Sequence, residues 1–187
     1  MLEKEIKVFI NQDEYNTLIN EFDFTKTYIQ TNYYYFNKEM VDNLTIRIRE
    51  KNSKLMLQIK IPRSINKSLH MKEEYEKEFE SIPQYINKDL IAELANIELK
   101  NDVYYIGKLI TERRINEEYQ GIEISLDKNQ YLDTIDYELE IEYVGVYPQK
   151  VIDRIQKLNI KVDREVDGKN TRYMNRLEEV KDSESNY

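Results

Sequence analysis

Apolar and polar residues alternate along much of the chain, with the period of two that is typical of β-strands. In the opening MLEKEIKVFI, Ile6, Val8 and Ile10 share one face of such a strand, whereas Glu3 and Glu5 share the other. The same alternation recurs further along the chain. It predicts eight strands, near residues 2–10, 27–37, 44–50, 54–61, 70–80, 103–115, 121–127 and 136–144.

Three segments have apolar residues at helical spacing instead, and they predict amphipathic helices. These segments span residues 11–22, 87–99 and 148–160. RSINKS (63–68) is typical of a loop and DKNQ (127–130) of a turn. The largely polar residues 178–187 predict a flexible C-terminal tail after a single domain of residues 1–177.

The polar strand faces are charged, and two architectures fit them. LTIRIRE places Arg47 and Arg49 on one face, and YELEIEY does the same with Glu138 and Glu140. Periodicity alone favours an antiparallel sheet with one face in the core and one in water. The amphipathic helices, however, need an apolar surface to cover. If they cover the apolar strand faces, the charged faces point into a closed barrel, which must hold water, metal ions or a charged ligand.

Composition narrows the functional classes. A chain of 187 residues is long enough for one domain. It has no cysteine, which excludes disulfides and thiolate chemistry and fits a reducing compartment. No apolar run reaches the ~18 residues of a membrane span and no signal peptide is recognisable, so we expect a cytoplasmic protein without membrane contact. The net charge of −8 argues against binding to duplex nucleic acid, although a local basic pocket is compatible with it.

Short motifs in the chain resemble a known family. EKEIK, residues 3–7, matches the ExExK signature of the CYTH proteins, the triphosphate tunnel metalloenzymes. The resemblance continues in order through QTNYYYF, IRIRE, LQIKIP, KEEYE, LITER, ISLD and DYELEIE. It implies an α+β fold around a closed eight-stranded antiparallel β-barrel, a tunnel with a charged interior and helices packed outside. Family members act, with a divalent metal, on inorganic triphosphate, thiamine triphosphate, RNA 5′-ends or, in class IV adenylate cyclases, ATP.

The resemblance also implies roles for individual residues. The metal ligands are Glu3, Glu5, Asp127, Glu138 and Glu140. The phosphate-binding residues are Arg47, Arg49, Lys60, Lys72 and Arg113, with Lys169 or Arg172 near the C-terminus. Lys7 and Tyr34 are the catalytic candidates, with the register among the three consecutive tyrosines open by one residue. Further tunnel acids without an assigned role are Glu74, Glu76 and Glu142.

These residue types suit phosphoryl transfer. Carboxylate oxygens favour Mg²⁺ or Mn²⁺, and guanidinium groups bind phosphate through two hydrogen bonds. The attacking water is activated either by a second metal near Asp127 or by a Lys7–Tyr34 pair. The expected enzyme is a divalent-metal-dependent triphosphatase, with inorganic triphosphate the first choice because no adenine or thiamine pocket is identifiable.

Alternatives of other kinds remain open. They are a class IV-type adenylate cyclase, a thiamine triphosphatase and a non-catalytic module that binds polyphosphate. The expected partner is a small molecule that contains a triphosphate, and a homodimer is one option for assembly.

Overall fold

The structure is a computed structural model that describes residues 3–40, 44–66, 69–164 and 166–185. The side chains of Glu3, of residues 62–72 and of Ser185 lie outside this description. The chain divides into two compact units. Unit 1 comprises residues 1–29 and 110–168, and unit 2 comprises residues 30–109 and 169–187. Two long strands, β2 (Lys26–Phe36) and β7 (Val103–Asn116), contribute residues to both units.

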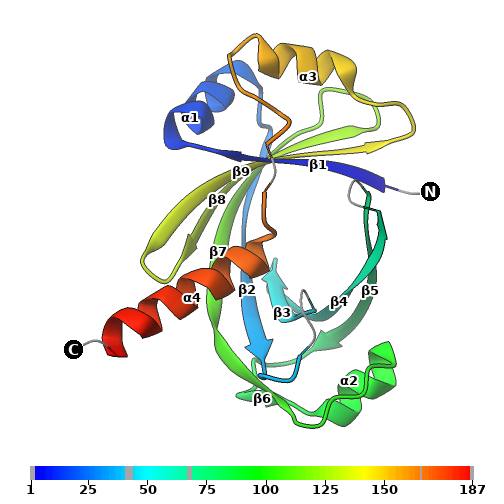
Figure 1. Ribbon diagram of the computed structural model, residues 1–187. Coiled ribbons are helices and arrows are strands. Elements are labelled where there is room, and N and C mark those ends of the chain that lie inside the picture. Colours follow the sequence, from blue (N-terminus) through cyan, green and yellow to red (C-terminus); the bar gives the residue numbers. More distant parts are fainter. Residues whose placement is uncertain (1–2, 41–43, 67–68, 165, 186–187) are drawn as a thin grey trace. The chain divides into compact units, whose positions relative to one another are not determined.

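Unit 1 is built on three antiparallel strands, with β9 paired to β1 on one side and to β8 on the other (Figure 1). Its own elements are β1 (Glu3–Ile10), α1 (Gln12–Glu21), β8 (Ile122–Tyr131), β9 (Thr134–Val144) and α3 (Gln149–Gln156). The apolar faces of the strands pack against α1 and α3 in one hydrophobic core, in which Val8, Leu139 and Ile155 are fully buried. The helices therefore cover the apolar faces of these strands and leave the charged faces on the other side.

Two arginines hold the helices of unit 1 in place. Helix α1 begins with a capping box, in which Asn11 and Glu14 exchange side chain–backbone hydrogen bonds of 2.9 Å. Arg164 donates to both carboxylate oxygens of Glu14 and to the backbone oxygen of Phe9. Arg154 of α3 donates to the Glu21 carboxylate at the end of α1. The segment after β9 is thereby attached to β1 and α1, and β1 carries the ExExK motif.

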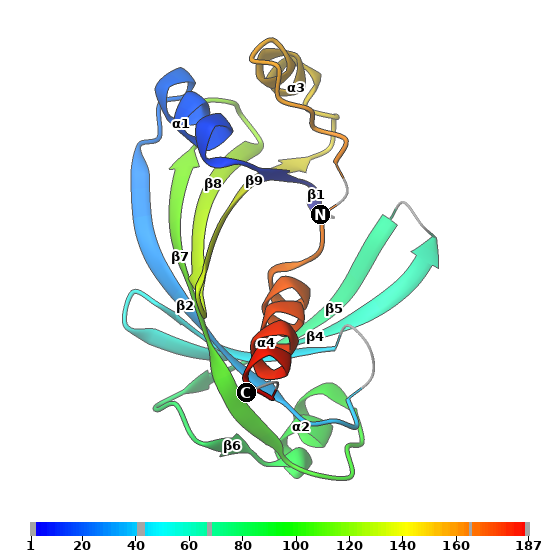
Figure 2. The same ribbon diagram turned by 60° about the vertical axis from the view of Figure 1, so that its left-hand side comes forward.

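Unit 2 contains a meander of antiparallel strands, in which β2, β3, β4 and β5 pair in sequence order (Figure 2). Its own elements are β3 (Thr45–Lys51), β4 (Lys54–Asn66), β5 (Leu69–Phe79), β6 (Tyr85–Ile86), α2 (Lys88–Ala95) and α4 (Lys169–Ser185). The core contains Ile46, Ile48 and Leu57 from the strands and Ile91 from α2. Here too a helix packs on the apolar strand faces.

The strands together form one nine-stranded sheet in the order β1-β9-β8-β7-β2-β3-β4-β5, with the short β6 paired to β7. Four helices occur in the described residues, so the α+β class with a large antiparallel sheet is confirmed. Closure of the sheet into a tunnel stays a prediction. In the described part of the chain, no helix is long and apolar enough to cross a membrane.

Two sequence predictions about connections were wrong. The expected turn at residues 127–130 lies inside β8, and the chain turns at Leu132 instead, where φ is 49°. Asp127 and Asn129 are turn-forming residues in isolation, but both are buried and pair with β9. The expected loop at residues 63–68 is largely strand, because β4 continues to Asn66 and β5 begins at Leu69. Residues 67 and 68 lie outside the described residues.

Helix α4 was not predicted. Residues 178–185, expected to be a tail, form its last turns, and the flexibility of this segment stays a prediction. The helix docks through Tyr173, which is 1% exposed and whose hydroxyl donates to the Ile106 carbonyl over 3.1 Å. Gly107 makes room for this contact. A Cβ atom at Gly107 would lie 1.9 Å from the Tyr173 hydroxyl oxygen, and its φ of +139° is accessible mainly to glycine.

Gly107→Ala should therefore destabilise the protein by roughly 2 kcal/mol or more, from backbone strain and displacement of Tyr173. Urea denaturation measures the free energy of unfolding. Gly168→Ala is the matched control, because a Cβ there meets nothing within 4 Å. Equal stability of the two variants would contradict this account of how α4 docks.

Candidate functional site

The charged face of unit 1 is assembled by the register of its strands. In the pairing of β1 with β9, Glu5 lies opposite Glu142 and Lys7 lies opposite Glu140. In the pairing of β8 with β9, Asp127 lies opposite Glu138. Residues directly opposite one another in an antiparallel pair point to the same face. Carboxylates from three strands therefore gather on one surface.

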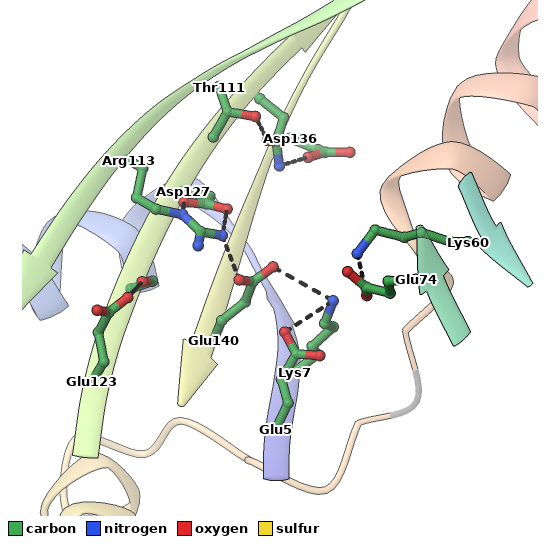
Figure 3. A network of polar contacts seen from close by, with 12 residues as sticks. Glu5, Lys7, Lys60, Glu74, Thr111, Arg113, Glu123, Asp127, Asp136 and Glu140 are labelled. Atoms are coloured by element: carbon green, nitrogen blue, oxygen red, sulfur yellow. Dashed lines mark hydrogen bonds and ion pairs between the residues drawn. The ribbon is translucent and has the colours of Figure 1, made fainter. Parts of the chain in front are cut away.

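Two cations join these carboxylates in a chain of contacts (Figure 3). Arg113 of β7 donates through Nε and Nη2 to the two carboxylate oxygens of Asp127, over 2.7 Å each. Its Nη2 also contacts Glu140 Oε2. The other oxygen of Glu140 lies 3.6 Å from Lys7 Nζ, which is itself 3.0 Å from Glu5 Oε1. Glu140 is thus the shared partner of Arg113 and Lys7.

The carboxylates are close enough together to hold a metal ion. Asp127, Glu138 and Glu140 are all buried and offer ligand oxygens within 4.8 Å of one another. Glu5, Glu140 and Glu142 form a second such group. Oxygen ligands of this kind are those that Mg²⁺ and Mn²⁺ prefer, so the residues fit the ion.

Negative charge accumulates at this face. Burial raises the pKa of Glu142, and the neighbouring charges of Glu140, Glu5 and Glu123 raise it further. Burial acts to lower the pKa of Arg113, but its hydrogen bond to Asp127 and the charge of Glu140 outweigh this effect and raise it. The field that keeps Arg113 charged also favours a bound cation.

The charged face of unit 2 carries basic residues held by neutral and acidic partners. Arg47 Nε donates to Gln58 Oε1 over 2.8 Å, and Gln58 in turn donates to Glu76. Arg49 Nε donates to Asn32 Oδ1 over 2.9 Å. These contacts run across neighbouring strands of the meander. They hold two guanidinium groups side by side on β3.

Lys60 of β4 belongs to the same face, and Figure 3 shows its contact with Glu74. Its Nζ donates to Glu74 Oε1 over 2.5 Å. Burial and the positive charge of Arg47 nevertheless lower the pKa of Lys60 to about 8, with Glu74 offsetting part of the shift. A lysine whose positive charge is costly in the free protein is suited to binding an anion.

Tyr34 is the tyrosine of the triplet that lies on this face. It is opposite Arg47 in the strand register and is 1% exposed, and its ring centroid is 5.0 Å from that of Tyr173. Tyr33 and Tyr35 contact Tyr105 instead. Burial raises the pKa of the Tyr34 hydroxyl, while the charges of Arg47, Lys169 and Arg49 partly offset the shift.

The structure places the remaining predicted residues as follows. Lys169 and Arg172 are half-buried in the first turn of α4, and Lys169 is close enough for its charge to act on Tyr34. Glu74 and Glu76 are exposed on β5. The backbones of Glu3 and Lys72 lie in β1 and β5, and their side chains are outside the described residues.

Sequence reasoning missed the amides of this site. Asn32 and Gln58 bind the two arginines, and although they lie within QTNYYYF and LQIKIP, neither was given a role. Their positions were nevertheless open to inference, since Asn32 precedes Tyr34 by two residues and Gln58 precedes Lys60 by two. In strands, this spacing puts both residues of each pair on one face.

The alternative of a solvated charged face is wrong for the central residues of both units. Asp127 and Glu138 are 0% exposed, and Glu140 is 3% exposed. Arg47 is 6% exposed. These charges are buried on the strand faces opposite α1, α2 and α3, as the amphipathic helices suggested, whereas α4 contacts the charged face of unit 2 through Tyr173 and Tyr34.

The fold and the two charged faces define an α+β protein whose antiparallel strands bury acidic and basic side chains. The model of the CYTH domain matches residues 1–161, and the chain belongs to this family. Members of the CYTH family are metal-dependent enzymes that act on triphosphates. No curated protein matches the chain.

Solved structures show the same fold. An adenylate cyclase candidate from Bacillus halodurans is 20% identical, with a TM-score of 0.66 over 92% of this chain and 99% of that one. HpAC1 from Hippeastrum, an adenylyl cyclase candidate with a dominant triphosphatase activity, is 18% identical, with a TM-score of 0.68 over 93% of this chain and 96% of that one. PH1819 from Pyrococcus horikoshii is 22% identical, with a TM-score of 0.51 over 84% of this chain and 86% of that one.

Removing Arg113 should leave Asp127 and Glu140 buried beside each other without their shared cation. We expect Arg113→Ala to destabilise the metal-free protein in EDTA by about 3 to 5 kcal/mol, as measured by urea denaturation. Lys26→Ala is the control, because its ion pair with Glu117 is exposed on both sides and contributes little. A small loss for Arg113→Ala, similar to the control, would show that Arg113 is not needed to bury these acids.

Proposed function

We propose that this protein is a divalent-metal-dependent triphosphatase, which hydrolyses inorganic triphosphate to phosphate and diphosphate. The observation that carries the proposal is the buried group of Asp127, Glu138 and Glu140, whose oxygens lie close enough to share one ion. The proposal includes the closed eight-stranded antiparallel tunnel with a charged interior that the sequence predicts. A cytoplasmic location and a homodimer stay predictions from the sequence.

The acids of unit 1 would hold the ion. The proposed ligands are Glu3, Glu5, Asp127, Glu138 and Glu140, with Glu142 beside them. When bound, Mg²⁺ or Mn²⁺ supplies positive charge at the phosphoryl group under attack and a site for water. Arg113 keeps Asp127 and Glu140 in fixed positions through its paired hydrogen bonds. Two of the proposed ligands are therefore held in position by the protein itself.

The bases of unit 2 would bind the substrate. A triphosphate carries about four negative charges at neutral pH, and guanidinium groups bind phosphate oxygens through two hydrogen bonds. Arg47 and Arg49 are held through Nε, which orients each guanidinium plane. Lys60 adds a charge that becomes more favourable once an anion is present. Lys72, Arg113 and one of Lys169 and Arg172 complete the proposed set.

The two catalytic candidates, Tyr34 and Lys7, are both suited to donate hydrogen bonds to a phosphoryl group. The raised pKa of Tyr34 keeps its hydroxyl protonated at neutral pH, so it acts as a hydrogen-bond donor rather than a base. Lys7 Nζ lies 3.0 Å from a carboxylate oxygen of Glu5 and 3.6 Å from one of Glu140. Both residues therefore stabilise negative charge on the phosphoryl oxygens. Phosphoryl transfer depends mainly on such positioning and charge stabilisation.

A phosphate-release assay tests the proposal. Purified protein should release orthophosphate from inorganic triphosphate with Mg²⁺ or Mn²⁺, lose this activity in EDTA and regain it when metal is restored. Glu5→Gln should abolish turnover and leave the thermal unfolding midpoint near that of the wild type, since Glu5 is exposed. Thiamine triphosphate and ATP, assayed in parallel, identify the alternatives.

Each alternative gives a distinct product pattern. A class IV-type cyclase forms cyclic AMP and diphosphate from ATP and leaves inorganic triphosphate intact. A thiamine triphosphatase prefers thiamine triphosphate, and a binding module retains triphosphate without releasing phosphate. Wild-type turnover by Glu5→Gln would show that the proposed metal site is wrong.

The pH dependence of substrate binding tests Lys60. With a pKa of about 8, Lys60 is charged below pH 8 and neutral above it, so binding of the anion requires proton uptake at higher pH. We expect KM for triphosphate, at saturating metal, to rise between pH 8 and 9.5 by up to about tenfold per pH unit. Lys60→Arg keeps its charge and should lose this rise. If KM rises equally with pH in the wild type and in Lys60→Arg, the rise is caused by the titration of another group.

A further inference from the structure

Asn32 on β2 has a buried hydrogen-bond donor without a partner. Its side chain is 0% exposed, and its Nδ2 has no hydrogen-bond partner among the described residues. Its Oδ1 accepts from Arg49 Nε over 2.9 Å. Buried polar groups in folded proteins are nearly always hydrogen-bonded, so the Asn32 amide nitrogen is a donor that the oxygen of a ligand or of water can use.

Arg49 fixes which end of the amide is unpaired. The Nε–H of an arginine can only donate, so the atom of Asn32 that faces it must be the acceptor, Oδ1. Rotating the amide by half a turn would oppose two donors and lose this hydrogen bond. The Nδ2 group therefore points away from Arg49 Nε, and the unpaired donor belongs to the folded structure.

The surroundings of Asn32 indicate an anionic ligand. Tyr34, two residues further along β2 and on the same face, is 1% exposed, and its hydroxyl, which lies beside the Arg47 side chain, donates no hydrogen bond in the described part of the chain. Arg49 and Arg47 lie opposite these two residues on β3. Two groups that can donate, beside two guanidinium groups, suit an oxygen of an anion and exclude a cation.

We propose that Asn32 is a substrate-binding residue, whose Nδ2 donates a hydrogen bond to a phosphate oxygen of the triphosphate. Arg49 holds the amide in the orientation that this contact requires. The proposal rests on the proposed function and adds a neutral donor to its basic residues. The donor is neutral, so its contribution depends on contact with the oxygen rather than on charge.

Substitutions at Asn32 separate this role from a merely structural one. Asn32→Asp keeps an acceptor for Arg49 Nε and removes the donor, whereas Asn32→Ala removes both. We expect both variants to raise KM for inorganic triphosphate by at least about tenfold, with a smaller change in kcat. If Asn32 only positions Arg49, the Asp variant should keep the wild-type KM.

Asn32→Asp also introduces a negative charge, which requires a control. Gln30→Glu adds the same charge to the same face of β2, two residues away, at a side chain that is also buried. We expect it to raise KM less than threefold, because the field of the added charge acts at a longer distance. Thermal unfolding checks that the three variants are folded.

NMR of the wild-type protein tests the same contact and does not depend on whether the variants fold. The side-chain amide signals of Asn32 are followed by NMR while a non-hydrolysable imido analogue of triphosphate is added with Mg²⁺. We expect the Nδ2 proton signals to shift downfield. Binding of the analogue without that shift, or a wild-type KM in both Asn32 variants, overturns the inference and leaves the proposed function intact. If the wild-type protein neither binds nor cleaves triphosphate, the proposed function and this inference are both overturned.

Discussion

Charge buried on one face of each strand is the constraint on which this structure depends. The strands bury apolar residues beneath helices on one face and still bury Asp127, Glu138 and Arg47 on the other. A carboxylate out of water is tolerated only with a cation or several hydrogen bonds beside it. In unit 1, Arg113 meets this requirement for Asp127 and Glu140 together. The strand register has to bring these three residues to one place.

The two units bury charges of opposite sign. The charged face of unit 1 carries mainly acids, and that of unit 2 carries the basic residues. In unit 1, burial and the neighbouring charges of Glu140, Glu5 and Glu123 raise the pKa of Glu142. In unit 2, burial and the positive charge of Arg47 lower the pKa of Lys60 to about 8. Burial is the larger cause of both shifts, and nearby charges of like sign add to each. A bound divalent cation would favour the charged form of Glu142, and a bound anion would favour that of Lys60.

Side-chain amides orient the arginines on the charged face of unit 2. Gln58 and Asn32 each accept a hydrogen bond from an arginine Nε, which orients the guanidinium groups without neutralising them. A carboxylate in either position would hold the arginine equally well but would cancel the charge that a phosphate needs. Neutral acceptors thus keep Arg47 and Arg49 both fixed and positively charged.

Most strands and three helices followed from the sequence, because alternation and helical spacing are local patterns. The errors occurred where local preference and tertiary contacts disagree. The residues DKNQ favour a turn in isolation, yet Asn129 is held by Thr111 and Asp136 in a buried network and continues β8. Helix α4 has few apolar residues, and its docking depends on the space above Gly107, which no helical pattern reveals. Tyr173, Leu177 and Val180 were the signal that was available, at spacings of four and three residues.

The sequence by itself determined the class of fold, the family and which charged residues share a strand face. The ExExK motif and the alternation of the strands are local patterns that can be recognised in a single sequence. Which charges meet was decided only by the tertiary structure. Arg113 and Asp127 are 14 residues apart, and Arg49 and Asn32 are 17 apart. Their contacts depend on the register between strands, and a shift of one residue would turn every side chain to the opposite face. The same register, and no local property of the three consecutive tyrosines, selected Tyr34 for the charged face.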